Sequence, residues 1–446
     1  MIIPPRRAWC FVVVLAIAGC SSAGGFEAPL IREGVLTPEE ASAAKEASTG
    51  EASAKANGPM NNDPYAVETD SISYQNNTYR LRDLNPGQRP ALNTDEAGLW
   101  MQADHFEQRL KTSGNLVRDP AINAYLQQLT CKLAAEYCGD IRVYLSHTPN
   151  FNAFMTPNGV MNVWTGLLLR VDNEAQLAAV LGHEIGHYLR RHTVQLFRDA
   201  RDKSNAAAFL SIGLGAFGPI AQLAVLGTIF SYQRDMEREA DGYSLLLMAR
   251  AGYDAREAHK IWARILKEKE ADPDPDKGPY IYATHPPSAE RRDALADLGE
   301  KVHAKLGGDK VGTERFRAVI APYKTMLLHD EIDLRSFERS QALFDMLLEV
   351  DPNPARIIFF KGELHRVRGA SEPEDDTAAA LALYDQALAA KGQAPPELYR
   401  SKGLLLRRQG HAKAAAEAFR TYLEREPDSV ERPFIQSLIE TLEGSS

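Results

Sequence analysis

His183-Glu184-Ile185-Gly186-His187 is the stretch of sequence that decides the fold of the region around it. Histidines four residues apart share one face of a helix, with Cβ atoms about 6 Å apart, so both imidazoles can converge on one metal ion. The Glu184 carboxylate is rotated by one residue step from His183, so it can reach an attacking water molecule without ligating the metal. The pattern predicts a zinc site with His183 and His187 as ligands and Glu184 as general base.

A helix is expected over 174–192 to carry this motif. Leu177, Val180, Leu181 and Tyr188 recur at helical spacing and form its apolar face. The histidines are framed by apolar and small residues rather than by polar ones. This framing favours a buried ion over a pair of surface histidines.

A catalytic zinc site needs a third protein ligand and one open position. Glu237-Arg238-Glu239-Ala240-Asp241 lies downstream on a second expected helix. Glu237 and Asp241 are four residues apart on one face, so Glu237 can ligate zinc while Asp241 accepts a ring N–H from a ligating histidine and fixes its tautomer. Glu239 points elsewhere and is the less favoured ligand. The alternative is an ordinary acidic helix face.

These motifs together resemble the HtpX/BepA group of gluzincin metallopeptidases, over about residues 95–303. The resemblance implies a zinc metalloendopeptidase with one Zn²⁺ per chain and a mainly α (α+β), zincin-like fold with a small sheet. The other matching motifs are, in order, Asn152-Ala153-Phe154, Pro157-Asn158-Gly159, Thr165-Gly166-Leu167-Leu168, and Thr284-His285-Pro286-Pro287 with Arg291.

His285 and Arg291 are the two candidates for a positive group that stabilises the tetrahedral oxyanion of peptide hydrolysis. The sequence does not choose between them. His285 has a second possible role, because an imidazole after the acidic, proline-containing loop 271–278 could occupy the open zinc position and hold the enzyme inactive. An ordinary structural His-Pro turn is the alternative for His285.

Residues 141–145 and 159–164 alternate between apolar and polar side chains and predict two strands of a small sheet. Two helices are expected over 95–133, with a break at Asp119-Pro120. We expect an extended substrate to add as a further strand along an exposed sheet edge, through backbone hydrogen bonds that ignore sequence. The residues assigned to that edge are Asn158, Gly159, Val160, Met161, Asn162 and Val163.

The N-terminus has the features of an export signal. Arg6 and Arg7 precede an apolar run over 8–18, which is too short to span a bilayer. Ile17-Ala18-Gly19-Cys20 resembles the lipobox of bacterial lipoproteins, which implies lipidation of Cys20 and, with Ser21 next to it, sorting to the outer membrane. We therefore expect a signal peptide over 1–19 and a periplasmic, lipid-anchored protein.

Cys131 and Cys138 are the two cysteines outside the N-terminal targeting segment, and they either form a disulfide or remain buried free thiols. Seven residues of continuous helix would hold their Cα atoms about 10 Å apart, which is too far for a disulfide. A disulfide therefore requires the helix to end between them, and Gly139 is a plausible helix stop.

Residues 206–230 form the most apolar stretch after the signal and are long enough to cross a membrane. A true span would place the zinc ligands on either side of it in different compartments. We favour a buried helical hairpin. The alternatives are a membrane-dipping or substrate-contacting element and a true span, as in a membrane-embedded protease of the HtpX type.

The chain beyond residue 311 has a helical pattern throughout and contains a repeat. Lys361-Gly362 with Gly369 recurs as Lys402-Gly403 with Gly410. The aromatic residues Phe344, Tyr384 and Phe419 each precede a leucine by four residues, which resembles tetratricopeptide repeats. An ordinary helical bundle is the alternative.

These segments give the expected organisation: signal peptide 1–19, flexible tether 20–94, zinc metallopeptidase domain 95–310 and helical repeat domain 311–446. A net charge of −9 and 25% charged residues provide no basic footprint for nucleic acid. A lipoprotein signal, a peptidase and repeats together resemble BepA-like periplasmic proteases. That resemblance implies quality control of unfolded or misassembled envelope proteins, with the repeats docking outer-membrane assembly machinery. The alternative is a repeat-based periplasmic chaperone or assembly adaptor with a latent or structural zinc site.

Overall fold

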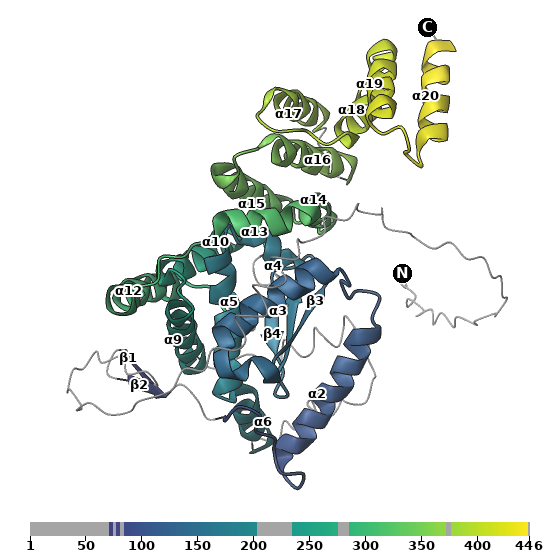
Figure 1. Ribbon diagram of the computed structural model, residues 1–446. Coiled ribbons are helices and arrows are strands. Elements are labelled where there is room, and N and C mark those ends of the chain that lie inside the picture. The colour runs from purple at the N-terminus through teal and green to yellow at the C-terminus, as the bar shows by residue number, and fades with distance from the viewer. Residues whose placement is uncertain are drawn as a thin grey trace, which may run out of the picture. The chain divides into compact units, whose positions relative to one another are not determined.

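The computed structural model describes residues 71–74, 77–80, 84–202, 234–274, 285–371 and 376–444 (Figure 1). The described part is mainly helical with a small sheet, which confirms the expected fold class. The elements up to the metal-binding motif are β1 (Ser71–Tyr74), β2 (Asn77–Arg80), α2 (Asp95–Thr112), α3 (Pro120–Ala134), the 3-10 helix η1 (Ala135–Asp140), β3 (Arg142–Ser146), β4 (Ala153–Met155), β5 (Val160–Trp164), α4 (Thr165–Arg170) and α5 (Glu174–Leu189).

The elements after that motif are helical. They are α6 (His192–Asp202), α9 (Arg234–Arg250), η2 (Ala255–Glu257), α10 (Ala258–Ala271), α12 (Ala289–Leu306), α13 (Thr313–Ile320), η4 (Ala321–Tyr323), α14 (Lys324–Asp333), α15 (Phe337–Val350), α16 (Ala355–Ser371), α17 (Thr377–Ala389), α18 (Glu397–Arg408), α19 (Ala412–Arg425) and α20 (Arg432–Gly444).

The three-stranded sheet has the order β3-β5-β4, with β3 parallel and β4 antiparallel to β5. The assignment of Asn158, Gly159, Val160, Met161, Asn162 and Val163 to an exposed edge is therefore wrong. Strand β5 is the central strand, every residue of it is buried, and both of its sides are paired. The outer strand beside α5 is β4, which at three residues is too short to show a period in the sequence.

The metal-binding helix α5 packs along α9, as Figure 1 shows. Two glycines permit the close approach. A Cβ atom on Gly186 would lie 2.9 Å from the Cβ of Tyr243, and one on Gly182 would lie 3.2 Å from the Cα of Ser244. The backbones of the two helices thus come near enough for side chains of both to meet.

Helix α5 ends at Leu189, three residues earlier than expected. Arg191 has a left-handed backbone, with φ of 55°. Its N–H donates to the carbonyl of Tyr188, and the next helix, α6, begins at His192. The chain therefore turns between α5 and α6, just after the metal-binding motif.

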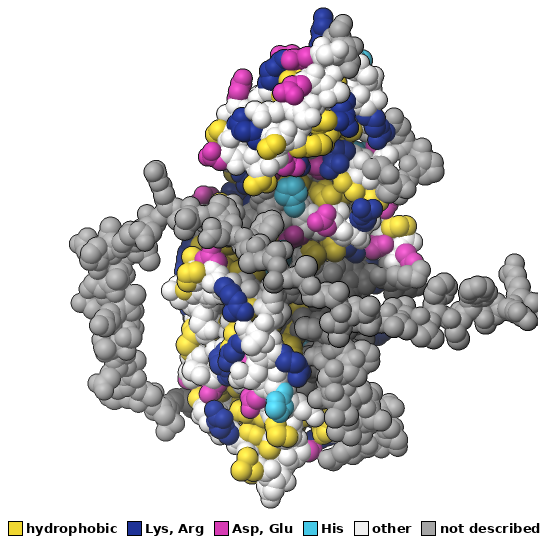
Figure 2. Space-filling view, turned by 90° about the vertical axis from the view of Figure 1, so that its right-hand side faces the viewer, with side chains coloured by type: hydrophobic (Ala, Val, Ile, Leu, Met, Phe, Trp, Pro, Cys, Tyr) yellow, Lys and Arg dark blue, Asp and Glu magenta, His cyan; other side chains and the backbone are white. Residues whose placement is uncertain are grey.

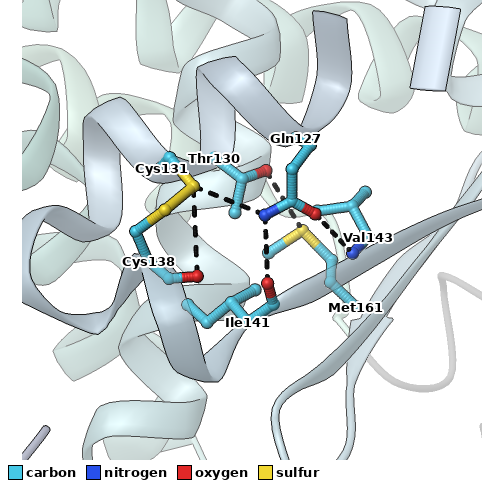
Figure 3. The surroundings of a disulfide bond; sticks show 7 residues. All are labelled: Gln127, Thr130, Cys131, Cys138, Ile141, Val143 and Met161. Atoms are coloured by element: carbon cyan, nitrogen blue, oxygen red, sulfur yellow. Dashed lines mark hydrogen bonds between the residues drawn. A yellow bond between two sulfur atoms is a disulfide. The ribbon is translucent and has the colours of Figure 1, made fainter. Parts of the chain in front are cut away.

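Cys131 and Cys138 form a disulfide, with their Cα atoms 4.5 Å apart (Figure 3). Helix α3 ends at Ala134, and Ala135 takes a positive φ of 50°, so the helix stops between the cysteines but well before Gly139. Gln127 ties this turn to the sheet, because its amide donates to the carbonyl of Ile141 and accepts from the N–H of Val143.

The expected boundary at 310/311 does not separate two hydrophobic cores. One continuous cluster of buried apolar side chains runs from Leu84 in the peptidase region to Leu405 in α18. Arg170 adds a buried ionic contact across the boundary, pairing with Glu268 of α10 and Glu331 of α14, each at 2.9 Å. Helices α14 and α15 are thus part of the packing that holds α4 and α10.

The later helices pack as pairs, α16 with α17 and α18 with α19. In each pair a glycine of the first helix faces an aromatic ring of the second. A Cβ on Gly362 would lie 2.7 Å from Cε1 of Tyr384, and one on Gly403 would lie 2.6 Å from Cε1 of Phe419. The repeated positions in the sequence therefore do the same job in successive pairs, while their assignment as tetratricopeptide repeats remains a prediction.

Three of the expected segments lie outside the described residues. They are the signal peptide, Cys20 and the apolar stretch 206–230. The expected tether differs at its end, where β1 and β2 pair antiparallel and the Tyr137 hydroxyl donates to the carbonyl of Leu84. Within the described ranges, no helix has the length and apolar character needed to cross a membrane.

Candidate metal centre

Four buried side chains from three parts of the chain converge at one point: His183 and His187 on α5, Glu237 on α9 and His285 just before α12. The Nε2 atoms of the two α5 histidines are 2.9 Å apart. Glu237 Oε1 lies 3.3 Å from Nε2 of His187. His285 Nδ1 lies 3.2 Å from Nε2 of His183 and 2.8 Å from Oε1 of Glu237.

This set of atoms fits a tetrahedral zinc ion. Ligand atoms 2.0 to 2.1 Å from a tetrahedral zinc lie about 3.3 Å from one another. Four of the separations here run from 2.8 to 3.3 Å, and all four ligand atoms lie within 4.8 Å of one another. Nitrogen and carboxylate donors are also the ligands that zinc prefers. Burial lowers the pKa of both His183 and His187, which favours the neutral imidazoles that bind metals.

The orientation of His183 is set by Asp241, whose Oδ1 lies 2.8 Å from Nδ1 of the imidazole. A proton on Nδ1 leaves the lone pair of Nε2 directed at the other ligands. Arg291 in turn holds the Asp241 carboxylate with both of its arms, Nε at 2.8 Å and Nη2 at 2.7 Å. The structure therefore brings Asp241 to the position that the sequence suggested for it.

Glu184 lies beside the four converging groups and is 2% exposed. Burial raises the pKa of its carboxyl to about 7, and Glu237 adds to the rise, although the charges of His285 and Arg291 oppose it. The backbone of Met155, on strand β4, also contributes a hydrogen bond to Glu184. Among the described residues its Oε2 atom has no hydrogen-bond partner, so one oxygen is left to act on a reactant.

His285 contacts both Glu184 and the other converging side chains. Its Nε2 lies 3.6 Å from Oε1 of Glu184, while its Nδ1 points at the metal ligands. Burial alone would lower the pKa of His285, but the carboxylates of Glu237 and Glu184 raise it above its usual value. In this arrangement His285 fills a corner of the centre.

Arg291 is held by three neighbours. Its guanidinium stacks on the ring of Trp262 at 3.6 Å from the centroid. It also pairs with Glu237 at 2.9 Å and with Asp241 at 2.7 Å. These contacts hold the guanidinium against the two carboxylates, and Arg291 also lines the cavity between α9 and α12. Trp262, on α10, also meets the ring of His183 edge to face, a contact that no motif or periodicity predicts.

Sequence reasoning missed His192, which lies directly against His187. The two Nδ1 atoms are 2.8 Å apart, and Nε2 of His192 lies 3.1 Å from Oε2 of Glu239. On a continuous helix His192 would be rotated about 140° from His187, so no helical periodicity could place them together. The only sign of this contact in the sequence is the pair of arginines before His192, which ends the apolar pattern of α5.

A cavity of about 280 Å³ adjoins the centre between α9 and α12. It has Glu237 and Asp241 at one end and an apolar wall of Leu295 and Leu298. The face shown in Figure 2 mixes basic, acidic and hydrophobic side chains in its described part, so no surface of a single charge gathers there.

Comparison with known proteins agrees with this geometry. Residues 116–298 match the family model of peptidase family M48. The chain is 28% identical over 198 residues to the beta-barrel assembly-enhancing protease of Escherichia coli, covering 41% of this chain and 40% of that protein. It is 34% identical over 182 residues to the mitochondrial metalloendopeptidase OMA1 of Arabidopsis thaliana, covering 39% and 36%.

The chain spans less than half the length of the curated relatives it matches. The matched region nevertheless contains every group of the centre, from the motif on α5 to His285 and Arg291. Residues 116–298 thus carry a peptidase M48 domain, and over this region the chain resembles the BepA-like gluzincin metallopeptidases.

Proposed function

We propose that this protein is a zinc-dependent endopeptidase that hydrolyses peptide bonds of unfolded or misassembled envelope proteins. The observation that supports this proposal best is the convergence of His183, His187 and Glu237 next to the buried carboxyl of Glu184. Three protein ligands beside a carboxyl group with a pKa of about 7 form the arrangement that peptide hydrolysis at neutral pH requires.

His183, His187 and Glu237 would hold the zinc ion. When bound, zinc supplies a Lewis acid that polarises the scissile carbonyl and acidifies the attacking water. Glu184 accepts the proton of that water on its carboxylate and returns it to the leaving amine. Asp241 keeps the imidazole of His183 in its productive tautomer, and Arg291 keeps Asp241 in place.

The substrate would bind as an extended strand alongside β4, the outer strand of the sheet that contacts α5. Met155 of β4 contributes a backbone hydrogen bond to Glu184, so a peptide paired with this strand would pass the carboxyl group. Backbone pairing selects extended chains without regard to their side chains. Unfolded or misassembled proteins offer such chains, whereas folded proteins do not.

His285 would regulate access to the centre. A catalytic zinc site keeps one position open, and a site with four protein ligands is closed. Because His285 Nδ1 lies among the ligand atoms, the described conformation corresponds to a closed state, and His285 would have to leave before a substrate binds. The same set of four groups is also what favours the second candidate function, a chaperone or assembly adaptor with a structural zinc site.

The proposed location is the periplasm, with attachment to the outer membrane through a lipid on Cys20. The lipobox-like sequence supports the attachment, and the name of the Escherichia coli relative supports a role in envelope protein assembly. The helices after residue 311, which pack in pairs, would dock assembly machinery or a client protein. No nucleic acid is an expected partner of a chain with net charge −9.

The test of the peptidase proposal is the substitution Glu184→Gln, which keeps the shape of the side chain and removes the base. The purified variant should bind one zinc ion per chain and lose cleavage of unfolded casein by at least about 100-fold. The control is the parent protein freed of zinc with a chelator, which should regain activity when zinc is restored. Undiminished cleavage of casein by the variant would leave the adaptor function as the better account.

A further inference from the structure

The reversal of the chain after α5 places a second histidine against a metal ligand. His192 is fully buried, and its Nδ1 atom lies 2.8 Å from Nδ1 of His187. The left-handed conformation of Arg191 makes this contact possible, and a salt bridge from Arg191 to Glu96 holds the turn. A left-handed backbone is strained at a residue with a side chain and persists where the surroundings fix it.

The proton positions along this contact can be derived from the ends. Nε2 of His187 faces the other metal ligands and must offer a lone pair, so the ring proton is on Nδ1. That N–H donates to Nδ1 of His192, which leaves the proton of His192 on Nε2. This second N–H faces Oε2 of Glu239 at 3.1 Å, where a carboxylate accepts it.

The far end of the chain of hydrogen bonds is also held. Nε of Arg190 donates to Oε1 of Glu239 at 2.6 Å. The carboxylate of Glu239 is thus held between the N–H of His192 and the guanidinium of Arg190. Each donor in the series from His187 to Glu239 therefore meets an acceptor.

We propose that His192 and Glu239 are positioning residues that fix the tautomer and ring orientation of His187 for metal binding. The inference rests on the zinc site of the proposed function. It gives His187 the same support that Asp241 and Arg291 give to His183: a ring N–H that ends on a carboxylate clamped by an arginine. Helix α9 supplies both carboxylates as well as the ligand Glu237.

The experiment compares two substitutions of His192 by their zinc affinity, measured by competition with a chelator. His192→Phe keeps a planar ring and removes the acceptor, so the dissociation constant for zinc should rise by about 10- to 100-fold. His192→Asn restores an acceptor near the position of Nδ1, so it should recover most of the loss. Tyr188→Phe, on α5 next to His187 and outside the series of hydrogen bonds, is the matched control and should bind zinc as the parent does.

If His192 only supported the fold, the zinc affinity and the ligand geometry would not depend on whether residue 192 offers an acceptor. Cobalt bound in place of zinc reports ligand geometry through its visible absorption, and its bands should shift in His192→Phe and return in His192→Asn. Parent-like zinc affinity of His192→Phe, or equal losses in both variants, would overturn the inference.

Two further comparisons keep the test decisive. If metal-free His192→Phe melts well below the parent, Glu239→Gln at the part-exposed end of the series takes its place, with an expected rise of about 3- to 10-fold in the zinc dissociation constant. An unchanged constant in Glu239→Gln would then reject the inference. Failure of the parent protein to bind zinc would instead reject the proposed function.

Discussion

In the proposed function, the side chain of His285 would close or open the fourth corner of the metal centre. If it acts as a removable ligand, His285→Ala should raise hydrolysis of an unfolded substrate by about threefold or more, because the fraction of molecules with an open site increases. The assay is the initial rate of casein cleavage with zinc in excess, so that a weaker metal affinity does not mask the gain.

The other expected role of His285 gives the opposite sign. Loss of an oxyanion-stabilising group typically lowers the rate by about 100-fold or more. A fall of that size in His285→Ala would show that His285 moves onto the substrate during the reaction. Arg291 is a poor substitute for that role in the described conformation, since Trp262, Glu237 and Asp241 occupy its guanidinium.

Individual residues also show what the sequence could and could not reveal. His183, Glu184 and His187 follow from helical spacing, because two histidines four apart on a helix must share a face. Asp241 and Glu237 follow for the same reason. His192 could not be found in this way, since its place depends on the backbone conformation of Arg191, which spacing does not encode.

At the scale of elements, long helices were predictable and short strands were not. Helices α2, α3 and α5 follow from apolar periodicity, and Asp119-Pro120 marks the start of α3. Strand β4 has three residues, all buried, so it shows no alternation and was missed. Without β4, the predicted sheet has β5 at its edge, and the substrate was therefore expected there. In the structure β5 is the middle strand, between β3 and β4.

The disulfide between Cys131 and Cys138 gives a prediction about the element that it closes. A loop of this length should contribute about 2 to 3 kcal/mol to the free energy of unfolding. Cys131→Ser with Cys138→Ser should therefore unfold at a lower urea concentration than the parent, with an unchanged slope. The control is the parent treated with a reductant, which should show the same shift.

The reason lies in what the bridge constrains. Its turn joins α3 to β3, and Gln127 links the same turn to the backbone of β3. A stability equal to that of the parent would mean that these hydrogen bonds hold the turn without the covalent link.

At the scale of the whole molecule, the peptidase region and the first helices after residue 311 share a core and a buried ionic cluster. The expected boundary came from a change in sequence pattern, which reports helical periodicity but not the contacts between segments. Arg170 carries no sign in the sequence that it bridges Glu268 and Glu331, which are 98 and 161 residues away. Tertiary contacts of that range cannot be read from local spacing.

Arg170→Met tests whether this cluster joins the two regions into one cooperative unit. All three side chains are at most 2% exposed, so removal of the cation leaves two buried carboxylates without their partner. Breaking a buried pair in this way typically costs about 3 to 5 kcal/mol.

Urea unfolding followed by circular dichroism should show a single transition that shifts by this amount. Lys402→Met, which removes the partly exposed ion pair with Asp385, is the matched control and should cost no more than about 1 kcal/mol. Two separate transitions, of which the later one is unchanged in Arg170→Met, would show instead that the helices fold independently of the peptidase. In that case a signal from a docked partner could not reach α4 and α10 through the shared core.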